Sequence, residues 1–369
     1  MKQTKIEAML FALLKASLQE LPANESFFID AFEDDWVKCY QLATQQGVMA
    51  VAWDGIQSLP TKLQPPIDLK IVWGLTVEQY EKKYVRYCRT ASELSDYYAK
   101  HHIAMVQLKG VGLSSCYPIP SHREGGDIDI YTYSADKEKM TDLEANSLAD
   151  NLIKRQGIEV NMHSPKHSNF YYKGIPIENH KTFLNVETYP IAKQMNKVLH
   201  NYLQPQLTTL VDGKYFIQTP SPAFNALFLT FHAAQHYGSG LALHHLYDWA
   251  CLLKRYGWCL PEEVTDKRLL RFIQALTGLA HCLLGTAFYK DADTDMMNKI
   301  YQEIFHPRYS TKTIPVKGYW NILVYKYKRF MYKFHLKQEV IEGSLIKRLW
   351  ESIIAHLRHP CSIFCTEAL

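Results

Sequence analysis

The chain has 369 residues, of which 47% are hydrophobic and 21% charged, and its formal net charge is +4 at pH 7. This composition excludes an intrinsically disordered chain, and so mild a charge does not by itself indicate a nucleic-acid partner. The length exceeds that of a usual single core, so we expect two or three domains.

The first part of the chain, residues 1–100, has the apolar spacing of helices. Pro60 and Pro65–Pro66 interrupt this pattern, and a long helix is expected over about 75–100. We therefore expect an N-terminal helical region.

The apolar run of residues 6–14 contains Glu7 and is followed by Lys15, and its spacing is helical. We interpret this run as an amphipathic helix that packs on the domain rather than as a signal sequence. No run approaches the length of a membrane span. The expected location is the cytoplasm.

Residues 101–218 change to short apolar strands separated by turns. Strands are expected at 103–108, 127–132, 158–163, 168–173 and 175–180, with helices near 111–117 and 136–155. Thr219-Pro220-Ser221-Pro222 marks the next boundary, and residues 219–369 are helical in pattern. The expected fold class is α+β, with a small mixed sheet between an N-terminal helical region and a C-terminal helical domain.

The most informative segment joins a glycine-rich turn to two carboxylates. The strand that ends at Leu108 leads into Lys109-Gly110-Val111-Gly112, and Gly125-Gly126 precede Asp127-Ile128-Asp129. Glycines let the backbone approach a phosphate, whose charge the start of a helix also favours. Asp127 and Asp129 leave the same face of a strand, so their repulsion favours a divalent cation such as Mg²⁺ between them. Either feature alone is common in proteins without such a site, but the two together predict one.

This segment resembles the polymerase-beta-like nucleotidyltransferase superfamily and, more closely, nucleotidyltransferase family 5. The resemblance rests on Leu-Lys-Gly-x-x-Leu, Tyr117-Pro118, Arg123 and Asp-Ile-Asp-Ile, and it extends downstream to the helical segment around His232. One departure is Val111, because many superfamily members carry Gly or Ser at that position. The resemblance implies a nucleotidyltransferase core in the 101–218 region.

The resemblance also implies the reaction and the residues that carry it. A nucleoside monophosphate would pass from a nucleoside triphosphate, most simply ATP, to an acceptor hydroxyl or phosphate, and pyrophosphate would leave. Two Mg²⁺ (or Mn²⁺) ions about 3.5–4 Å apart would clamp the attacking and leaving oxygens. The residues expected to hold the triphosphate or its charge are Lys109, Gly110, Gly112, Ser114, Arg123 and His180.

Superfamily members usually have a third carboxylate on a later strand, and two residues compete for this role. We favour Glu178, which follows the turn Lys173-Gly174 and precedes His180 by two residues. Glu159 is the rival. The third carboxylate would accept the proton of the attacking hydroxyl or help Asp127 and Asp129 to hold the metal.

His232 and His236 lie four residues apart, on one face of an expected helix. This spacing can bind zinc, but the sequence lacks the Glu of the His-Glu-x-x-His hydrolases. Packing and cleft lining are therefore favoured over metal binding. The family resemblance suggests that this helix, with His244, His245 and Asp248, helps to position the substrate.

The eight cysteines include no Cys-x-x-Cys pair, so the sequence indicates neither a zinc knuckle nor a secreted disulfide framework. His359, Cys361 and Cys365 cluster near the end of the chain, but three ligands without a fourth make a poor zinc site. Residues 325–337 interleave cations with aromatic rings, which is typical of a solvated basic helix. Peripheral contact with an anionic membrane is the alternative.

Several alternatives stay open at this stage. The acceptor is a small molecule, a sugar-lipid intermediate, a protein side chain or tRNA, and no stable nucleic-acid partner is required. A catalytically inactive module with the same fold would bind a nucleotide or a partner protein, although the retained Asp pair argues against it. A metal-dependent phosphohydrolase would need His163, His167 or His180 to share a metal with that pair.

Overall fold

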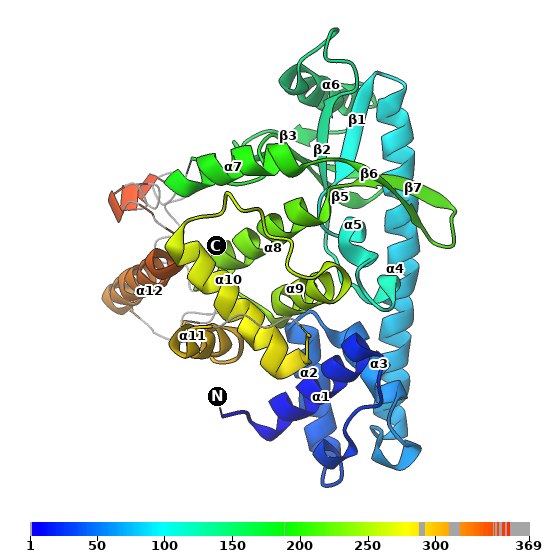
Figure 1. Cartoon of the computed structure of the whole chain (residues 1–369), viewed down its shortest axis with the longest axis vertical. Helices are drawn as coiled ribbons and strands as arrows, with labels where there is room; N and C mark the ends of the chain where they lie inside the picture. The colour runs from blue at the N-terminus through cyan, green and yellow to red at the C-terminus, as the bar shows by residue number, and fades with distance from the viewer. Residues whose placement is uncertain are drawn as a thin grey trace.

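The computed structural model describes residues 2–187, 189–287, 292–309 and 318–341, together with 343, 345, 346, 349, 350, 353 and 354. Within these residues, twelve α-helices surround one seven-stranded mixed sheet (Figure 1). The predicted α+β class is therefore confirmed.

Four α-helices build the N-terminal region: α1 (Lys5–Gln19), α2 (Glu33–Gln45), α3 (Met49–Gln57) and α4 (Ile67–Ala99). The Thr4 side chain accepts a hydrogen bond from the Glu7 amide and starts α1 in a capping box. Helix α4 begins directly after Pro66, earlier than the spacing predicted, because proline is tolerated at a helix start. In Figure 1, α4 runs from the N-terminal helices to the sheet.

The sheet has the order β3-β4-β5-β2-β1-β7-β6. Its strands are β1 (Ile103–Gln107), β2 (Ile128–Ser134), β3 (Val160–Asn161), β4 (His167–Tyr172), β5 (Ile175–His180), β6 (Gln206–Leu210) and β7 (Tyr215–Thr219). The central strand β2 pairs antiparallel with β1 and parallel with β5. All five predicted strands are present, although the one expected at 158–163 is reduced to two residues.

Two elements in this part of the chain were not expected. The β6–β7 hairpin extends the sheet beyond β1, to which β7 pairs in parallel. Helix α7 (Pro190–Tyr202) precedes the hairpin. The short helix α5 (Val111–Ser114) follows the glycine turn as predicted, and α6 (Asp142–Arg155) starts later than predicted because Thr141 and Glu144 form a capping box there.

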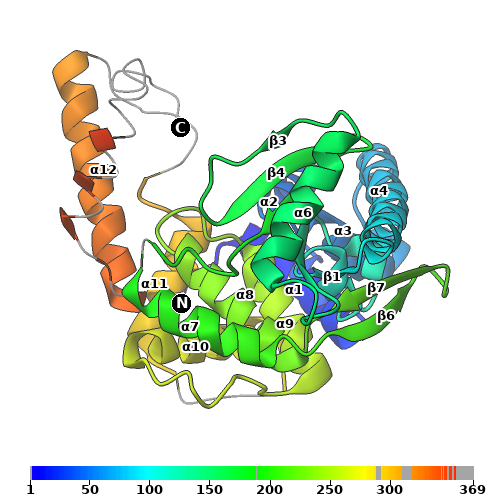
Figure 2. The same cartoon turned by 90° about the horizontal axis from the view of Figure 1, so that it is seen from above.

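The C-terminal part is helical, as expected, with α8 (Pro222–His236), α9 (Leu243–Tyr256), α10 (Lys267–Leu279), α11 (Thr294–Phe305) and α12 (Tyr319–Val340). Short 3₁₀ or π turns occur at Glu25–Phe27, Thr61–Leu63, Pro120–His122 and Ala280–Leu284. Figure 2 shows α12 on the side of the molecule away from α4. The basic segment 325–337 lies within α12, and its contact with a membrane stays a prediction.

Two groups of buried side chains form the interior. The smaller group joins the sheet to α4 and α6, and it includes Ile103, Ile130 and Ile153. The larger group joins residues of the N-terminal helices, such as Leu13, to residues of the C-terminal helices, such as Phe272. The expected division at residues 100 and 218 stays a prediction, because the two helical regions contribute to one apolar interior.

None of the helices in the described ranges is long and apolar enough to cross a membrane. The six cysteines that the structure describes are free thiols. His359, Cys361 and Cys365 lie outside the described residues.

Candidate functional site

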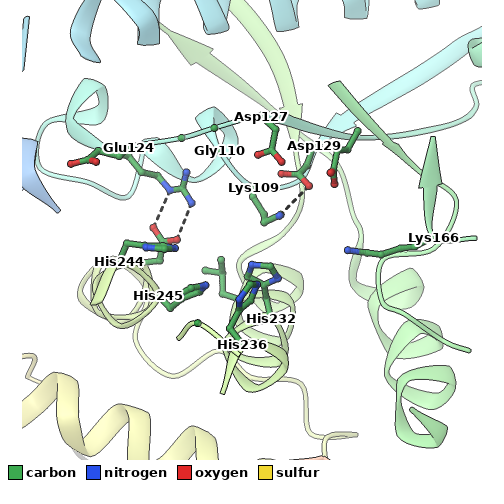
Figure 3. Close-up of a pocket in the computed structure, with 17 residues that line it drawn as sticks. Lys109, Gly110, Glu124, Asp127, Asp129, Lys166, His232, His236, His244 and His245 are labelled. Atoms are coloured by element: carbon green, nitrogen blue, oxygen red, sulfur yellow. Dashed lines mark hydrogen bonds and ion pairs between the residues drawn. The ribbon is translucent and has the colours of Figure 1, made fainter. Parts of the chain in front are cut away.

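A cavity of about 440 Å³ lies between the N-terminal end of β2, where Asp127 and Asp129 are located, and helices α8 and α9 (Figure 3). Carboxylates and lysines line it on the side of the sheet, and histidines line it on the side of the helices. The cavity therefore brings together residues from the predicted core and from the C-terminal helices.

Three carboxylates meet at the sheet side of the cavity. Asp129 lies on β2 directly opposite Glu178 on the parallel strand β5, and Asp127 immediately precedes β2. Side chains two residues apart leave the same face of an extended segment, so both aspartates point toward Glu178. One oxygen from each of the three lies within 4.8 Å of the others.

Glu159, the rival third carboxylate, is exposed and lies just before β3. It borders a separate hollow on the surface, where Asp127 and Glu178 also contribute. Among the described residues, the cluster around Asp127 and Asp129 takes Glu178 and not Glu159. The structure thus places Glu178 where the prediction needs it, and its chemical role stays a prediction.

Asp129 is the best-neutralised of the three. The Lys109 Nζ and the His180 Nε2 each lie 3.0 Å from its Oδ1 atom. Burial opposes the ionisation of Asp129, but Lys109 and His180 outweigh it and hold its pKa well below the usual range. Burial likewise opposes the charge of Lys109, and the carboxylates of Asp129 and Asp127 nevertheless raise its pKa. Both groups are charged at neutral pH.

The other two carboxylates differ from Asp129 and from each other. Burial, and then repulsion from Asp129, raises the pKa of Asp127. The interaction with His180, whose Nε2 atom lies 3.6 Å from the Glu178 Oε2 atom, lowers the pKa of Glu178 against the effect of its burial. Lys109 alone therefore does not fully offset the negative charge, and Asp127 is the group that a further cation would relieve most.

The glycine turn has two parts with different roles. Gly110 has a φ of 58°, which favours glycine, and it lines the cavity beside Lys109. A Cβ on Gly112 would lie 2.8 Å from the Gln107 carbonyl oxygen, so this glycine is required for packing against β1. The Ser114 hydroxyl is buried and donates to the Val111 carbonyl at 2.6 Å. Gly112 and Ser114, both expected to hold phosphate, thus lie outside the residues that line the cavity.

Arg123 is held by a buried ion pair rather than left free for phosphate. Its Nε and Nη2 atoms donate to the two carboxylate oxygens of Asp248 at 2.9 and 2.8 Å. Tyr117 donates a further hydrogen bond of 2.6 Å to the same carboxylate. This pair joins the loop before β2 to helix α9, so Arg123 braces the segment that leads to Asp127.

His180 also has a bracing position. Its side chain is fully buried, and its Nε2 atom is hydrogen-bonded to the Asp129 Oδ1 atom. The ring lies behind the carboxylates and does not line the cavity, where the sequence had suggested a nucleotide contact. His167 lies beside it, with its Nδ1 atom 3.4 Å from Glu178 Oε2.

Contacts from the N-terminal helices fix the loop that precedes Asp127, and the sequence alone did not reveal them. Glu124 accepts hydrogen bonds from the amides of Met49 and Ala50, at the start of α3. On α4, Lys83 donates to the Gly125 carbonyl at 2.6 Å, and the Tyr87 hydroxyl donates to the Gly126 carbonyl at 3.0 Å. The partners in these contacts are 39–75 positions apart in the sequence, and no local motif links them.

The helix side of the cavity carries a group of histidines. His232 and His236 of α8 meet His245 of α9, and one ring nitrogen from each lies within 4.8 Å of the others. Burial lowers the pKa of all three rings, that of His236 to about 4, so all are neutral at pH 7. Lys166 faces the same cavity from the sheet side (Figure 3). The sequence predicted that His232 and His236 share a face, but His245 joins them only through the packing of α8 on α9.

A mixed sheet with three converging carboxylates beside a glycine turn is the arrangement expected of a nucleotidyltransferase. The family model described as uncharacterised nucleotidyltransferase matches residues 33–285, which is more than half of the chain. The chain belongs to this family, and the resemblance seen in the sequence is confirmed. Neither the comparison with curated proteins nor that with solved structures found a match.

Proposed function

We propose that this protein is a metal-dependent nucleotidyltransferase that moves a nucleoside monophosphate from a nucleoside triphosphate to an acceptor. The observation that carries the proposal is the convergence of Asp127, Asp129 and Glu178 within 4.8 Å at the edge of a cavity that Lys109 and Gly110 also line. Family membership supports the general activity. The nucleotide, the metal and the acceptor are parts of the proposal.

The carboxylate cluster fits a hard divalent cation. Its donors are carboxylate oxygens, which Mg²⁺ and Mn²⁺ prefer, and repulsion within the cluster contributes to the raised pKa of Asp127. Asp127, Asp129 and Glu178 would hold the ion. When bound, it supplies charge stabilisation to the attacking and leaving oxygens.

The turn after β1 supports the placement of the triphosphate. Lys109 is a partly buried, charged ammonium at the cavity wall, and Gly110 lets a phosphate approach the backbone without meeting a side chain. Lys166 adds a second amine, also from the sheet side of the cavity. The triphosphate thus lies against Lys109 and Gly110, while Gly112, Ser114 and Arg123 support the walls around it.

In the proposed reaction, an acceptor oxygen attacks the α-phosphorus and forms the new P–O bond. The bond between the α-phosphorus and the oxygen that bridges to the β-phosphorus breaks, and pyrophosphate leaves with that electron pair. Glu178 is ionised at neutral pH because the adjacent His180 ring lowers its pKa. It is therefore in the form that accepts the proton of the acceptor hydroxyl.

Two alternatives are less well supported. A phosphohydrolase would need His163, His167 or His180 at the metal, but none of these lines the cavity, and His180 is hydrogen-bonded behind Asp129. Three adjacent carboxylates repel one another, and an inactive module without a bound cation would gain nothing that offsets this unfavourable repulsion. We retain ATP as the first nucleotide to test, and a small molecule, a sugar-lipid intermediate, a protein side chain and tRNA as acceptors. The proposed location is cytoplasmic.

The test uses purified protein, each α-³²P-labelled nucleoside triphosphate in turn, Mg²⁺ or Mn²⁺, and cell extract as the source of acceptor. Labelled product should form with the wild-type protein and disappear with a chelator. Asp127→Asn should abolish it without unfolding the chain, and Glu159→Gln is the matched control that should retain it. Transfer that persists at the wild-type rate in folded Asp127→Asn would contradict the proposal.

A further inference from the structure

The histidine group on the helix side of the cavity has the geometry of a metal site. Ring centroids are 4.5 Å apart for His232 and His236, 5.4 Å for His232 and His245, and 4.8 Å for His236 and His245. All three residues line the cavity, and two rigid helices present them. Three imidazoles on rigid elements are a common basis of metal sites in proteins.

The hydrogen bonds of the three rings leave nitrogens available. Within the described residues, the imidazole ring of neither His232 nor His236 forms a hydrogen bond. The Nδ1 atom of His245 accepts a hydrogen bond from the Ala242 amide at 3.1 Å and lies 3.2 Å from the Ala242 carbonyl oxygen. A metal at Nε2 requires the tautomer with hydrogen on Nδ1, in which the ring gives up the bond from the amide and donates to that carbonyl, the usual arrangement around a metal-bound histidine.

We propose that His232, His236 and His245 bind one divalent transition-metal ion of the zinc class, with a fourth position open to the cavity. Neutral imidazoles suit Zn²⁺, Co²⁺ or Ni²⁺, whereas Mg²⁺ requires oxygen ligands. Tetrahedral zinc sites have metal–nitrogen distances of about 2.0–2.1 Å, which put the ligands about 3.3 Å apart. Rotation of the rings brings nitrogens that now lie within 4.8 Å to that separation.

The histidine site and the carboxylate cluster differ in the charges that surround them. Burial lowers the pKa of His232 most, and the positive charges of Lys109 and Lys166 on the facing wall lower it further. The fourth position of the metal therefore favours an anionic oxygen from a cavity ligand. The proposal adds a second kind of metal to the cavity and does not depend on nucleotidyl transfer, because metal binding is measured directly.

The experiment titrates metal-free, full-length protein with Co²⁺ in excess Mg²⁺, so that Mg²⁺ fills the carboxylate cluster. One equivalent should bind with a ligand-field spectrum typical of nitrogen and oxygen ligands and without thiolate charge transfer. His236→Gln and His232→Gln should weaken binding at least 10-fold. His244→Gln, which changes the cavity histidine whose ring lies 4.0 Å from that of His245, is the matched control and should keep it.

Asp127→Asn separates this proposal from the proposed reaction, because it should lose nucleotidyl transfer and keep Co²⁺. If a histidine variant fails to fold, X-ray absorption of the wild-type Co²⁺ complex decides without any variant. Three imidazole ligands at about 2.0–2.1 Å support the site. A thiolate ligand, no stoichiometric binding, loss of Co²⁺ in Asp127→Asn, or unchanged binding in folded His236→Gln would overturn it.

Discussion

Asp127 and Asp129 offer the same chemical substitution, Asp→Asn, at two positions with opposite surroundings. Asp129 is 1% exposed and accepts from Lys109 and His180, each at 3.0 Å. Removing one partner of such a buried pair costs about 3–5 kcal/mol of unfolding free energy. Because asparagine keeps one acceptor oxygen, we expect Asp129→Asn to lie near the lower limit, about 3 kcal/mol. Asp127→Asn removes a carboxylate whose pKa is raised, so its unfolding free energy should equal or exceed that of the wild type.

Urea unfolding at pH 7, followed by tryptophan fluorescence, measures both changes against the wild type. The pKa directions also fix the pH dependence. The pKa of Asp129 is lowered by folding, so its stabilising effect is present above its unfolded pKa and is lost as pH falls toward the folded value. The pKa of Asp127 is raised by folding, so any gain from Asp127→Asn shrinks as pH falls through the folded pKa and is gone below the unfolded value. Equal effects of the two variants at pH 7 would refute this account of the cluster.

Three further predictions concern the site. If Glu178 is the general base, Glu178→Gln should lower turnover by about 10²–10⁴-fold in a steady-state assay and change triphosphate affinity little. Glu159→Gln should leave turnover nearly unchanged in the same assay. Gly110→Val should weaken the binding of a non-hydrolysable triphosphate in calorimetry. Unchanged affinity in a folded variant would show that the phosphates do not bind at this turn. Arg123→Met should lower the unfolding free energy by about 3–5 kcal/mol, and the apolar pair Arg123→Met with Asp248→Leu should recover much of that loss in urea unfolding.

The carboxylate side of the site was largely predictable because its signals are local. Asp127 and Asp129 share a face through the period of two in an extended chain, and Lys173-Gly174 marks the turn that starts β5. Glu178 then lies opposite Asp129 once β5 pairs with β2 in parallel. The pairing itself is not local, and it was the family resemblance that favoured Glu178 over Glu159.

The glycine turn shows where local pattern is insufficient. The sequence does not distinguish Gly110 from Gly112 within the turn. In the structure Gly110 lines the cavity, whereas Gly112 packs against Gln107. Ser114 likewise follows the turn as a phosphate-binding hydroxyl would, but α5 turns it toward the Val111 carbonyl. Which side of a short helix faces the cavity depends on what packs behind it, and here Tyr84 of α4 does so.

The missed elements depend on packing in the same way. The β6 strand, Gln206–Leu210, is largely exposed at the edge of the sheet, so it lacks the alternation of apolar and polar residues that reveals a half-buried strand. The third histidine, His245, is separated from His236 by a loop and the first turn of α9. Its position follows from how α9 crosses α8, which no spacing within either helix contains.

One buried ion pair connects the two sides of the cavity. Arg123 belongs to the loop that leads to Asp127, and Asp248 is three residues beyond His245 on α9. The pair therefore sets how far the carboxylates lie from the histidines, and Tyr117 holds its geometry from a third direction. Because the loop is also bound to α3 and α4, the sheet side is the more rigid reference, and a change in the pair should displace α9 relative to it. Contacts outside both clusters thus contribute to the separation between the carboxylates and the histidines.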